Sequence, residues 1–281
     1  MKTEIRNDSE LGRVLWMTDG QTELAVTLDV GIRVIHLSCA GMQNLLYRQP
    51  ADCSDGLQTP DGWRIFGGHR FWAAPESEKS YYPDQQPLEY ALAGDGVILC
   101  QPIDPWTGLQ KTLTLHFCPD GSIRAEHRLT NCSDHPVEAA AWGVTTMAGG
   151  GTAQIPFAGR VTETEQYNPE RVVSLWGTTS LGDERICFTK DGISATHLPS
   201  DDYFKIGLYS FAGKMTMQNF EQEFELSIKP LPMEDCADLG CNLELYMNRH
   251  VMELESLGKR TLMQLGQSAE HTEIWRVRKL S

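Results

Sequence analysis

The sequence lacks the short motifs that mark several large classes of enzyme. It contains no GxSxG turn of a serine hydrolase, no phosphate-binding P-loop, no GxGxxG opening a helix and no HExxH pair of zinc ligands. A run of three glycines at 149–151 follows a strand-like segment, but no Lys-Ser or Lys-Thr pair follows it, so it predicts a flexible turn. We therefore expect no cofactor and no bound metal.

Paired cysteines and long apolar runs are also missing. The eight cysteines are scattered, and the closest two, Cys236 and Cys241, do not have the CxxC spacing of a zinc site. Several lie in apolar segments, where a reduced thiol behaves as a small hydrophobic group. No run approaches the ~18–20 apolar residues of a membrane span, and residues 1–8 lack the apolar part of a signal peptide. We expect a cytoplasmic protein with reduced thiols.

Positive charge is scarce. The 281 residues include 24 Lys and Arg against 38 Asp and Glu, which gives a formal net charge of −14. Nucleic acids and anionic membranes favour basic surfaces, so neither is an expected partner. The composition, 41% hydrophobic and 22% charged, is that of an ordinary globular chain. A small molecule is the expected ligand, and the protein is expected to be a monomer or a homodimer.

What the sequence does contain is a succession of short strand-like segments. Residues 109–117 alternate apolar and polar side chains and end at Pro119-Asp120-Gly121, and residues 122–130 follow at once, which predicts a hairpin. Further strand-like segments are 23–28, 33–37, 137–144, 186–189, 204–208, 220–228, 243–247 and 273–277. Helical periodicity is limited to one or two turns at 41–47 and 182–185. The pattern predicts one all-β domain over residues 1–281, a large antiparallel β-sandwich with few short helices.

Residues 67–76, Gly-Gly-His-Arg-Phe-Trp-Ala-Ala-Pro-Glu, are the most informative segment. They place His69, Arg70, Trp72 and Glu76 close together. A buried strand has little reason to carry this mixture, because unpaired polar groups away from water are costly. A concave pocket for a polar molecule explains it, since such pockets combine aromatic walls with a few converging polar groups. A chain corner that holds His69 and Arg70 through backbone carbonyls is the alternative.

Three other clusters could contribute to such a pocket. The aromatic and polar loop at 81–87 is either a proline-fixed turn packed by two tyrosines or a site for a sugar, whose C–H face stacks on a ring while its hydroxyls take hydrogen bonds. On strands, Glu244 shares a face with Tyr246, and Glu253 shares a face with Glu255. These faces either meet solvent or line a cavity, where a carboxylate could act as a general base. Lys205 interrupts an apolar run, and it either extends to solvent or points into the site.

These residues resemble the galactose mutarotase-like superfamily, the β-sandwich fold of aldose 1-epimerases, over about the whole chain. The resemblance is to an uncharacterised group marked by GGHRxWxAPE, YxPDxxP, QPxxxxTGxxK and ELExLG, found here at 67–76, 81–87, 101–111 and 253–258. Residues 265–272 are similar to the family's closing strand, with Gly266-Gln267 in place of Pro-Gly. The resemblance implies a carbohydrate ligand and interconversion of sugar anomers by a glutamate base and a histidine acid.

Carried onto this chain, the resemblance implies that Glu255 is the base, with Glu253 as the neighbouring candidate, and that His69 and Arg70 bind near the site. The family's acid histidine corresponds to Trp142, whose indole cannot donate a proton at a useful pKa. Either His69 acts as the acid, or the protein binds sugars without epimerising them. Trp142 itself either packs in the core or forms the floor of a cavity.

Three functions follow from these residues. The first is a mutarotase-type isomerase in which Arg70 and Lys205 hold the substrate and Trp72 and Trp142 stack on it. The second is a non-catalytic sugar-binding or sensing sandwich. The third is an epimerase or lyase for an acidic sugar, with Arg70 and Lys205 clamping its carboxylate. Whether Glu76 and Glu244 belong to the site is left open.

Overall fold

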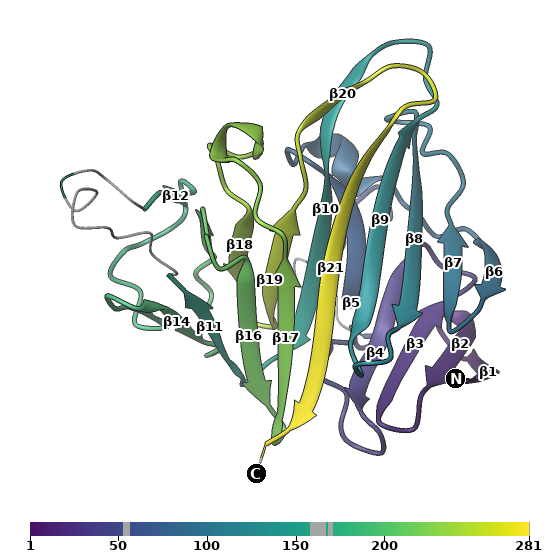
Figure 1. Cartoon of the computed structure of the whole chain (residues 1–281), viewed down its shortest axis with the longest axis horizontal. Helices are drawn as coiled ribbons and strands as arrows, with labels where there is room; N and C mark the ends of the chain where they lie inside the picture. Colours follow the sequence, from purple (N-terminus) through teal and green to yellow (C-terminus); the bar gives the residue numbers. More distant parts are fainter. Residues whose placement is uncertain (53–56, 158–166, 168–170, 281) are drawn as a thin grey trace.

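A computed structural model describes residues 1–52, 57–157, 167 and 171–280. Within these residues the chain forms two large antiparallel sheets that face each other (Figure 1). Strands β21, β9 and β8 of one sheet lie across β10, β5 and β4 of the other, with contacts between β10 and both β9 and β21. The predicted all-β antiparallel sandwich is therefore confirmed.

The first sheet carries the candidate site. Its strands, in spatial order, are β1 (Lys2–Asp8), β2 (Gly12–Thr18), β3 (Thr22–Thr27), β4 (Arg33–Cys39), β5 (Gly68–Ala74), β10 (Val137–Ala148), β19 (Val251–Leu257), β18 (Leu243–Met247), β15 (Phe204–Leu208) and β12 (Val173–Leu175). A short strand, β20 (Thr261–Met263), pairs with β10 beyond the end of β19.

The second sheet closes the sandwich. Its strands, in spatial order, are β13 (Ile186–Phe188), β14 (Gly192–Thr196), β11 (Thr152–Pro156), β16 (Lys214–Asn219), β17 (Gln222–Ile228), β21 (Ser268–Lys279), β9 (Ile123–Asn131), β8 (Leu109–Phe117), β7 (Gly96–Cys100) and β6 (Glu89–Ala93). Strands β8 and β9 form the predicted hairpin, with Leu109 paired to Asn131 and Phe117 to Ile123.

The helical turns expected at 41–47 and 182–185 are absent from the structure, and that expectation was wrong. The helical elements among the described residues are two 3-10 turns, η1 (Glu78–Tyr81) and η3 (Met233–Asp235). The segment at 41–47 instead runs along strands, since Leu45 bonds through its backbone to Leu37 and Ala148. Backbone pairing with a sheet outweighs a local helical pattern of one or two turns. Among the described residues, no helix has the length and apolar character needed to cross a bilayer.

The main core lies between the sheets and follows the period of two. On β8 the buried positions alternate with half-buried ones from Leu109 to Phe117, so one face of the strand packs inward. The cysteines in the described part of the chain are free thiols, and Cys236 and Cys241 are buried. These two thiols are buried as small side chains.

The centre of the first sheet departs from this one-sided pattern. Almost every residue of β10 and all seven residues of β19 are buried, so both faces of these strands are covered. One face meets the second sheet. The other lies under a small apolar cluster that includes Trp63, Trp72 and Trp142, with Tyr81 packed against it. This covered outer face holds the candidate site.

Candidate sugar-binding site

Strand β5 begins at two glycines that the backbone requires. Gly67 and Gly68 have φ angles of +97° and +71°, a region that side chains rarely adopt. A Cβ on Gly67 would lie 2.1 Å from the carbonyl oxygen of Tyr47, and one on Gly68 would lie 2.0 Å from that of Val34. The glycines therefore let β5 enter the sheet between two neighbouring segments, and they set which residues face outward.

The segment 67–76 is largely a buried strand, which corrects the expectation that a buried strand would not carry its mixture of residues. Alternation along β5 sends His69 and Phe71 toward the second sheet, and Arg70 and Trp72 to the outer face. Both polar side chains are buried and paired, His69 with Thr145 and Arg70 with Glu253. Pairing removes the cost of burial on which that expectation was based.

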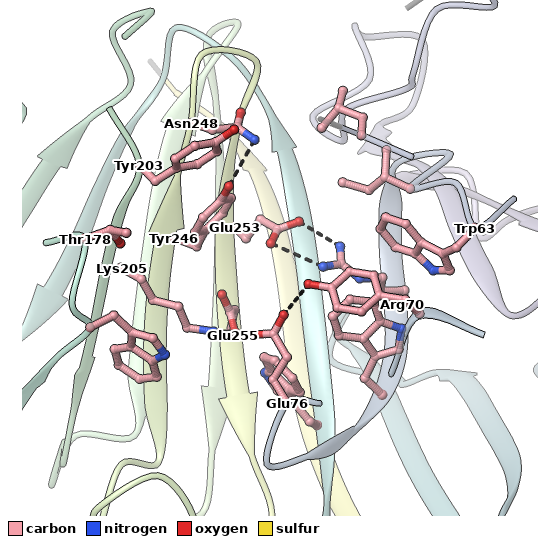
Figure 2. A pocket seen from close by; sticks show the side chains of 16 residues that line it. Trp63, Arg70, Glu76, Thr178, Tyr203, Lys205, Tyr246, Asn248, Glu253 and Glu255 are labelled. Atoms are coloured by element: carbon pink, nitrogen blue, oxygen red, sulfur yellow. Dashed lines mark hydrogen bonds and ion pairs between the residues drawn. The ribbon is translucent and has the colours of Figure 1, made fainter. Parts of the chain in front are cut away.

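The outer face of β5, β10, β19, β18 and β15 forms the floor of a cavity of about 260 Å³ (Figure 2). Residues from distant parts of the sequence lie side by side on this floor because of how the strands pair. Trp72 of β5 is opposite Trp142 of β10, and Tyr246 of β18 is opposite Glu253 of β19. The cavity is lined by Leu57, Trp63, Ile65, Arg70, Trp72, Glu76, Tyr81, Trp142, Trp176, Thr178, Tyr203, Lys205, Tyr246, Asn248, Glu253 and Glu255.

Arg70 and Glu253 form one of two ionic groups on this floor. Nη1 of Arg70 donates to Oε1 of Glu253 at 2.7 Å and Nη2 to Oε2 at 3.3 Å, and the Thr146 hydroxyl donates to the same carboxylate at 2.8 Å. Burial acts to raise the pKa of Glu253, but Arg70 and Thr146 outweigh it and hold the pKa below its ordinary value. The guanidinium also lies 4.2 Å from the ring centroid of Trp72. This pair is ionised and held firmly.

Lys205 is the centre of the second ionic group. Its Nζ lies 3.2 Å from Oε2 of Glu255 and 2.9 Å from Oε2 of Glu244, while Oε2 of Glu76 is 3.9 Å away. Only the contact with Glu255 has the geometry of a hydrogen bond between these side chains. The ammonium also lies over Trp142, 4.7 Å from its ring centroid. One cation therefore serves several carboxylates.

The two buried carboxylates beside Lys205 have raised pKa values. Burial raises the pKa of Glu255, and that of Glu244 well above its ordinary value, while the charge of Lys205 only partly opposes it. Burial acts to lower the pKa of Lys205, but Glu255 and Glu244 raise it above its ordinary value. The pKa values of Glu253 and Glu255 are thus shifted in opposite directions although the residues are two apart, because a guanidinium binds Glu253 while Glu255 shares its ammonium with Glu244.

Aromatic side chains form the walls. Trp72 and Trp142 lie edge to face with ring centroids 5.5 Å apart, and Trp63 packs against Tyr81 in the same way at 5.1 Å. The Tyr81 hydroxyl donates to Glu76. On the other side, Figure 2 shows Tyr246, Tyr203 and Asn248 facing Arg70 and Trp63 across the cavity. Burial raises the pKa of Tyr81 and that of Tyr246, so both phenols are neutral hydrogen-bonding groups.

The structure gathers most of the predicted site residues around this one cavity. Those that line it are Arg70, Trp72, Glu76, Trp142, Lys205, Tyr246, Glu253 and Glu255. Trp142 thus occupies the cavity floor rather than the core between the sheets. Glu244 does not line the cavity. It is fully buried and contacts Lys205, so the question left open for Glu244 is answered by a place beside the lysine and out of reach of a ligand in the cavity, whereas a direct contact with a sugar is excluded.

His69 is the main correction. It is fully buried on the inner face of β5, where Nδ1 lies 2.9 Å from the Thr145 hydroxyl and Nε2 lies 2.8 Å from Nε2 of His127. Adjacent residues of a strand face opposite ways, so His69 cannot share a cavity with Arg70. Burial, followed by the charges of His127 and Arg70, holds the pKa of His69 well below its ordinary value. The expected imidazole acid facing Glu255 is therefore wrong.

The histidines on the inner face form a neutral network with Glu273. His127 Nδ1 lies 3.3 Å from the carbonyl oxygen of His271, and His271 Nε2 lies 2.6 Å from the Ser256 hydroxyl, which donates to Glu273 at 2.5 Å. His69, His127 and Glu273 are also the described residues whose donor atoms lie close enough to hold a metal ion. Their atoms already pair with one another or with Thr145, Ser256 and Trp275. The arrangement therefore needs no ion to satisfy it.

The motif at 81–87 divides between the site and the fold. Tyr81 lines the cavity, whereas Asp84 is buried and receives Nη1 and Nη2 of Arg33 at 2.8 and 2.9 Å. Asp84 therefore anchors the loop that carries Tyr81. The segment at 48–62 is rich in Pro, Gly and Asp, which predicts a long loop that supplies a wall of the pocket. Leu57 of this segment lines the cavity, and residues 53–56 lie outside the described part of the chain.

Sequence reasoning assigned no site role to several lining residues from loops. These are Trp63, Ile65, Trp176 and Thr178. The signal for two of them was a tryptophan beside a glycine, in Gly62-Trp63 and Trp176-Gly177, within segments that have no strand-like alternation. A large aromatic residue in such a segment needs an apolar neighbour, and the cavity wall provides it.

The chain was compared with known proteins. No family model and no curated protein sequence matches it. Solved structures do. A galactose mutarotase-like protein from Lactobacillus casei has a TM-score of 0.63 at 9% identity, covering 94% of this chain and 100% of its own. A galactose mutarotase-like protein from Clostridium acetobutylicum has a TM-score of 0.57 at 9% identity, with 99% and 98% covered.

A third solved structure, a galactose 1-epimerase from Lactobacillus acidophilus, has a TM-score of 0.57 at 9% identity and covers 100% of this chain and 99% of its own. Identities this low carry no residue roles from one protein to another, because the same fold supports different activities. They do show the architecture over nearly the full length. The two-sheet sandwich described above is the galactose mutarotase-like fold.

Proposed function

We propose that the cavity binds a sugar and that the protein interconverts the anomers of an uncharged aldose, with Glu255 as the base. The observation that carries this proposal is a buried carboxylate of raised pKa on the floor of an aromatic-walled cavity. The tryptophan and tyrosine rings offer faces for the C–H side of a sugar ring. The carboxylates and neutral phenols offer hydrogen-bond partners for its hydroxyls.

Glu255 is a better base than Glu253. A general base works best when its pKa is near the operating pH, and burial raises the pKa of Glu255 in that direction. Glu253 has a lowered pKa and is held by Arg70 and Thr146, so it accepts a proton less readily. In this proposal Glu253 orients a sugar hydroxyl, and Glu255 removes the proton from the hydroxyl at C1.

Lys205 takes the place of the missing imidazole. When Glu255 accepts the proton from O1, it loses the negative charge that helps to hold the pKa of Lys205 high. The ammonium then becomes more acidic and donates a proton to the ring oxygen as the C1–O5 bond breaks. The sugar loses one proton and gains one. Glu255 and Lys205 are 3.2 Å apart, so the proton can return directly between them.

The charges around the cavity favour an uncharged sugar over an acidic or phosphorylated one. Arg70 is bound by Glu253, and Lys205 is bound by Glu255 and Glu244. A sugar carboxylate or phosphate would have to displace one of these buried partners. Removing a partner from a buried charge is strongly unfavourable. The clamp for an acidic sugar is therefore the weaker reading of these two cations.

Sugar binding without catalysis is the second candidate. Among the residues that the structure describes, the cavity is lined by no histidine, and the position expected for the acid histidine holds Trp142. This candidate differs from the first in one respect only. It has the same ligand and the same contacts but no proton transfer through Glu255 and Lys205.

The test is one-dimensional NMR of freshly dissolved α-glucose and α-galactose, and of their 6-phosphates, with and without the protein. We expect faster appearance of the β anomer for a neutral sugar and little effect on the phosphates. Glu255→Gln and Lys205→Met should each lower this rate by about 10²–10⁴-fold. Glu223→Gln is the matched control, because Glu223 is a buried strand carboxylate of the second sheet.

Each result separates the candidates. Binding of the neutral sugars without acceleration would leave the non-catalytic function. Acceleration that survives in Lys205→Met but not in Glu255→Gln would keep the base and reject the lysine as the acid. No binding of any sugar would reject the site itself.

A further inference from the structure

A second hollow adjoins the cavity. Its volume is about 430 Å³, and Thr178 and Tyr203 line both spaces. Figure 2 places these two residues on the side of the cavity opposite Trp63 and Arg70. The lining of the second hollow also includes Asp183, Glu184, Arg185, Leu198 and Asp202. A ligand in the cavity can therefore continue past Thr178 and Tyr203 without crossing the rest of the protein surface.

Tyr203 stands at the boundary as an aromatic platform. Its ring stacks on that of Tyr246, with centroids 6.3 Å apart and an angle of 22° between the planes. Tyr246 lines the cavity and is half-buried, whereas Tyr203 is 49% exposed. A half-exposed ring, held in place from below by a second ring, suits the C–H face of a sugar unit.

Arg185 gives the second hollow an unpaired donor. The residue is 4% exposed, and its Nε and Nη2 donate to Asp183 at 2.9 and 2.6 Å, while Nη2 also reaches the carbonyl oxygen of Asp202 at 3.0 Å. Its Nη1 is buried and has no partner among the described residues. Leaving a buried charged donor unpaired is costly, so a small shift of the side chain that brings Nη1 to an acceptor on a ligand would be stabilising.

The acidic groups of the hollow indicate the kind of acceptor. Asp183, Glu184 and Asp202 outnumber Arg185, the one basic residue among those lining the hollow in the described chain. Asp183 and Arg185 already neutralise each other. An anionic ligand would meet the remaining negative charge, whereas a hydroxyl oxygen can accept from Arg185 and donate to a carboxylate at once.

We propose that the second hollow is a subsite for a second sugar unit, and that the ligand class is an uncharged saccharide of at least two units with its reducing ring in the first cavity. The glycosidic link passes Thr178, and the second ring lies against Tyr203 with a hydroxyl toward Arg185. This inference rests on the proposed sugar-binding function of the first cavity and extends the same site.

The test is calorimetric titration of the protein with glucose, maltose, cellobiose and isomaltose, and with galactose and 4-O- and 6-O-linked galactose disaccharides. At least one linkage should bind ten-fold or more tightly than its own reducing monosaccharide. If the monosaccharide binds too weakly to measure, the detection limit sets a lower bound on the ratio of the two affinities, and a bound of ten-fold or more counts as the same result.

A substitution that fills the second hollow tests where the gain arises. Leu198→Trp adds bulk at a side chain that lines the hollow and is 47% exposed, so folding should be unaffected. It should remove most of the disaccharide gain and leave monosaccharide affinity unchanged. Leu181→Trp is the matched control, because Leu181 is 65% exposed and does not line the hollow. It should change neither affinity.

The outcomes separate this inference from the function on which it rests. If the monosaccharides bind and every disaccharide binds equally or more weakly, the subsite is rejected while the proposed function stands. A disaccharide gain that survives Leu198→Trp also rejects the subsite, because the second ring then lies elsewhere. If no saccharide binds, the first cavity is not a sugar site and both proposals fail.

Discussion

The outer and inner faces of β5, β10 and β19 hold buried polar groups in opposite ways. On the outer face the groups are charged, with Arg70 bound to Glu253 and Lys205 to Glu255. On the inner face they are hydrogen-bonded imidazoles, with His69 joined to His127 at 2.8 Å. The outer groups border the cavity, and the inner groups are buried between the two sheets.

A single sheet thus separates the candidate site from the buried network behind it. Charges remain ionised where opposite charges meet them, while burial without such partners lowers the pKa of a histidine and keeps it neutral. Strand β10 contributes residues to both faces. Gly143 of β10 has no side chain because a Cβ there would lie 2.2 Å from Oε1 of Glu273, so the inner network depends on that position.

The largest effect we expect is on the outer face, from Arg70→Met. This change removes the guanidinium that binds the Glu253 carboxylate and leaves a buried charge without a charged partner. It should lower the free energy of unfolding by about 3–5 kcal/mol. Arg128→Met, which removes an exposed ion pair with Glu270, should cost no more than about 1 kcal/mol. Urea denaturation of both variants measures the two values. Equal losses would show that the outer pair is no more than a surface ion pair.

The inner face should respond to His69→Leu with a smaller loss of stability. The change leaves Nε2 of His127 and the Thr145 hydroxyl without a partner, which should lower the free energy of unfolding by about 1–3 kcal/mol. Sugar binding and anomer exchange should stay within about two-fold of the wild type at temperatures where the variant is folded. A loss of anomer exchange of 10²-fold, with the fold intact, would restore His69 as the acid.

His69 also shows how far the sequence could lead. Alternating segments such as 109–117 were enough to predict strands and the sandwich, because period two is a local property of the chain. The same alternation separates His69 from Arg70, but it could be applied to residues 67–76 only after they were known to be a strand. Their mixture of polar groups argued against a strand, and the partners that make it possible, Thr145 and Glu253, lie far away in the sequence.

The site was predictable where one strand supplied two residues and unpredictable where strands had to be aligned. Glu253 and Glu255 share a face by alternation alone, and the structure places both on the cavity. The contact of Lys205 with Glu244 and Glu255 depends on the registers between β15, β18 and β19. No local pattern fixes the register between β15 and β18, which are far apart in the sequence, nor does it bring Trp63 and Trp176 from their loops to the same wall.

The neutral inner face predicts a loss of stability in acid. Burial lowers the pKa of His271 from 6.5 to about 3 and that of His127 to about 4. Between these values and 6.5 the unfolded chain binds protons that the folded chain does not, so stability falls as the pH falls through that window. Burial raises the pKa of Glu273 from 4.5 to about 7. Between these values the folded chain keeps a proton that the unfolded chain releases, so the contribution of Glu273 to stability rises as the pH falls, opposite to that of the histidines.

Comparing the wild type with His271→Gln isolates one of these groups. The glutamine amide can still donate toward Ser256, but it cannot take up a proton in the unfolded chain. Between pH 6 and pH 4 the wild type should therefore lose about 1.4 kcal/mol per pH unit relative to the variant. Denaturant melts at pH 7, 6, 5 and 4 measure this difference. A difference that does not change with pH would mean that His271 is protonated in the folded protein.

The smallest effect concerns the aromatic part of the outer face. Trp142 lies under Lys205 and beside Trp72, and its indole N–H has no partner among the described residues. Trp142→Phe keeps a ring at this place and removes the N–H and part of the stacking surface. An aromatic contact of this kind contributes about 0.5–1 kcal/mol, which corresponds to a two- to five-fold loss of sugar affinity.

Calorimetric titration of Trp142→Phe and of Trp16→Phe with the sugar would show whether this contribution to affinity comes from the cavity floor. Trp16 packs on His36, with ring centroids 4.7 Å apart, and does not line the cavity, so its substitution should leave sugar affinity unchanged. A loss far above five-fold in Trp142→Phe would mean that the indole N–H itself binds the sugar. An unchanged affinity would mean that the sugar touches the charged groups of this face but not the ring beneath Lys205.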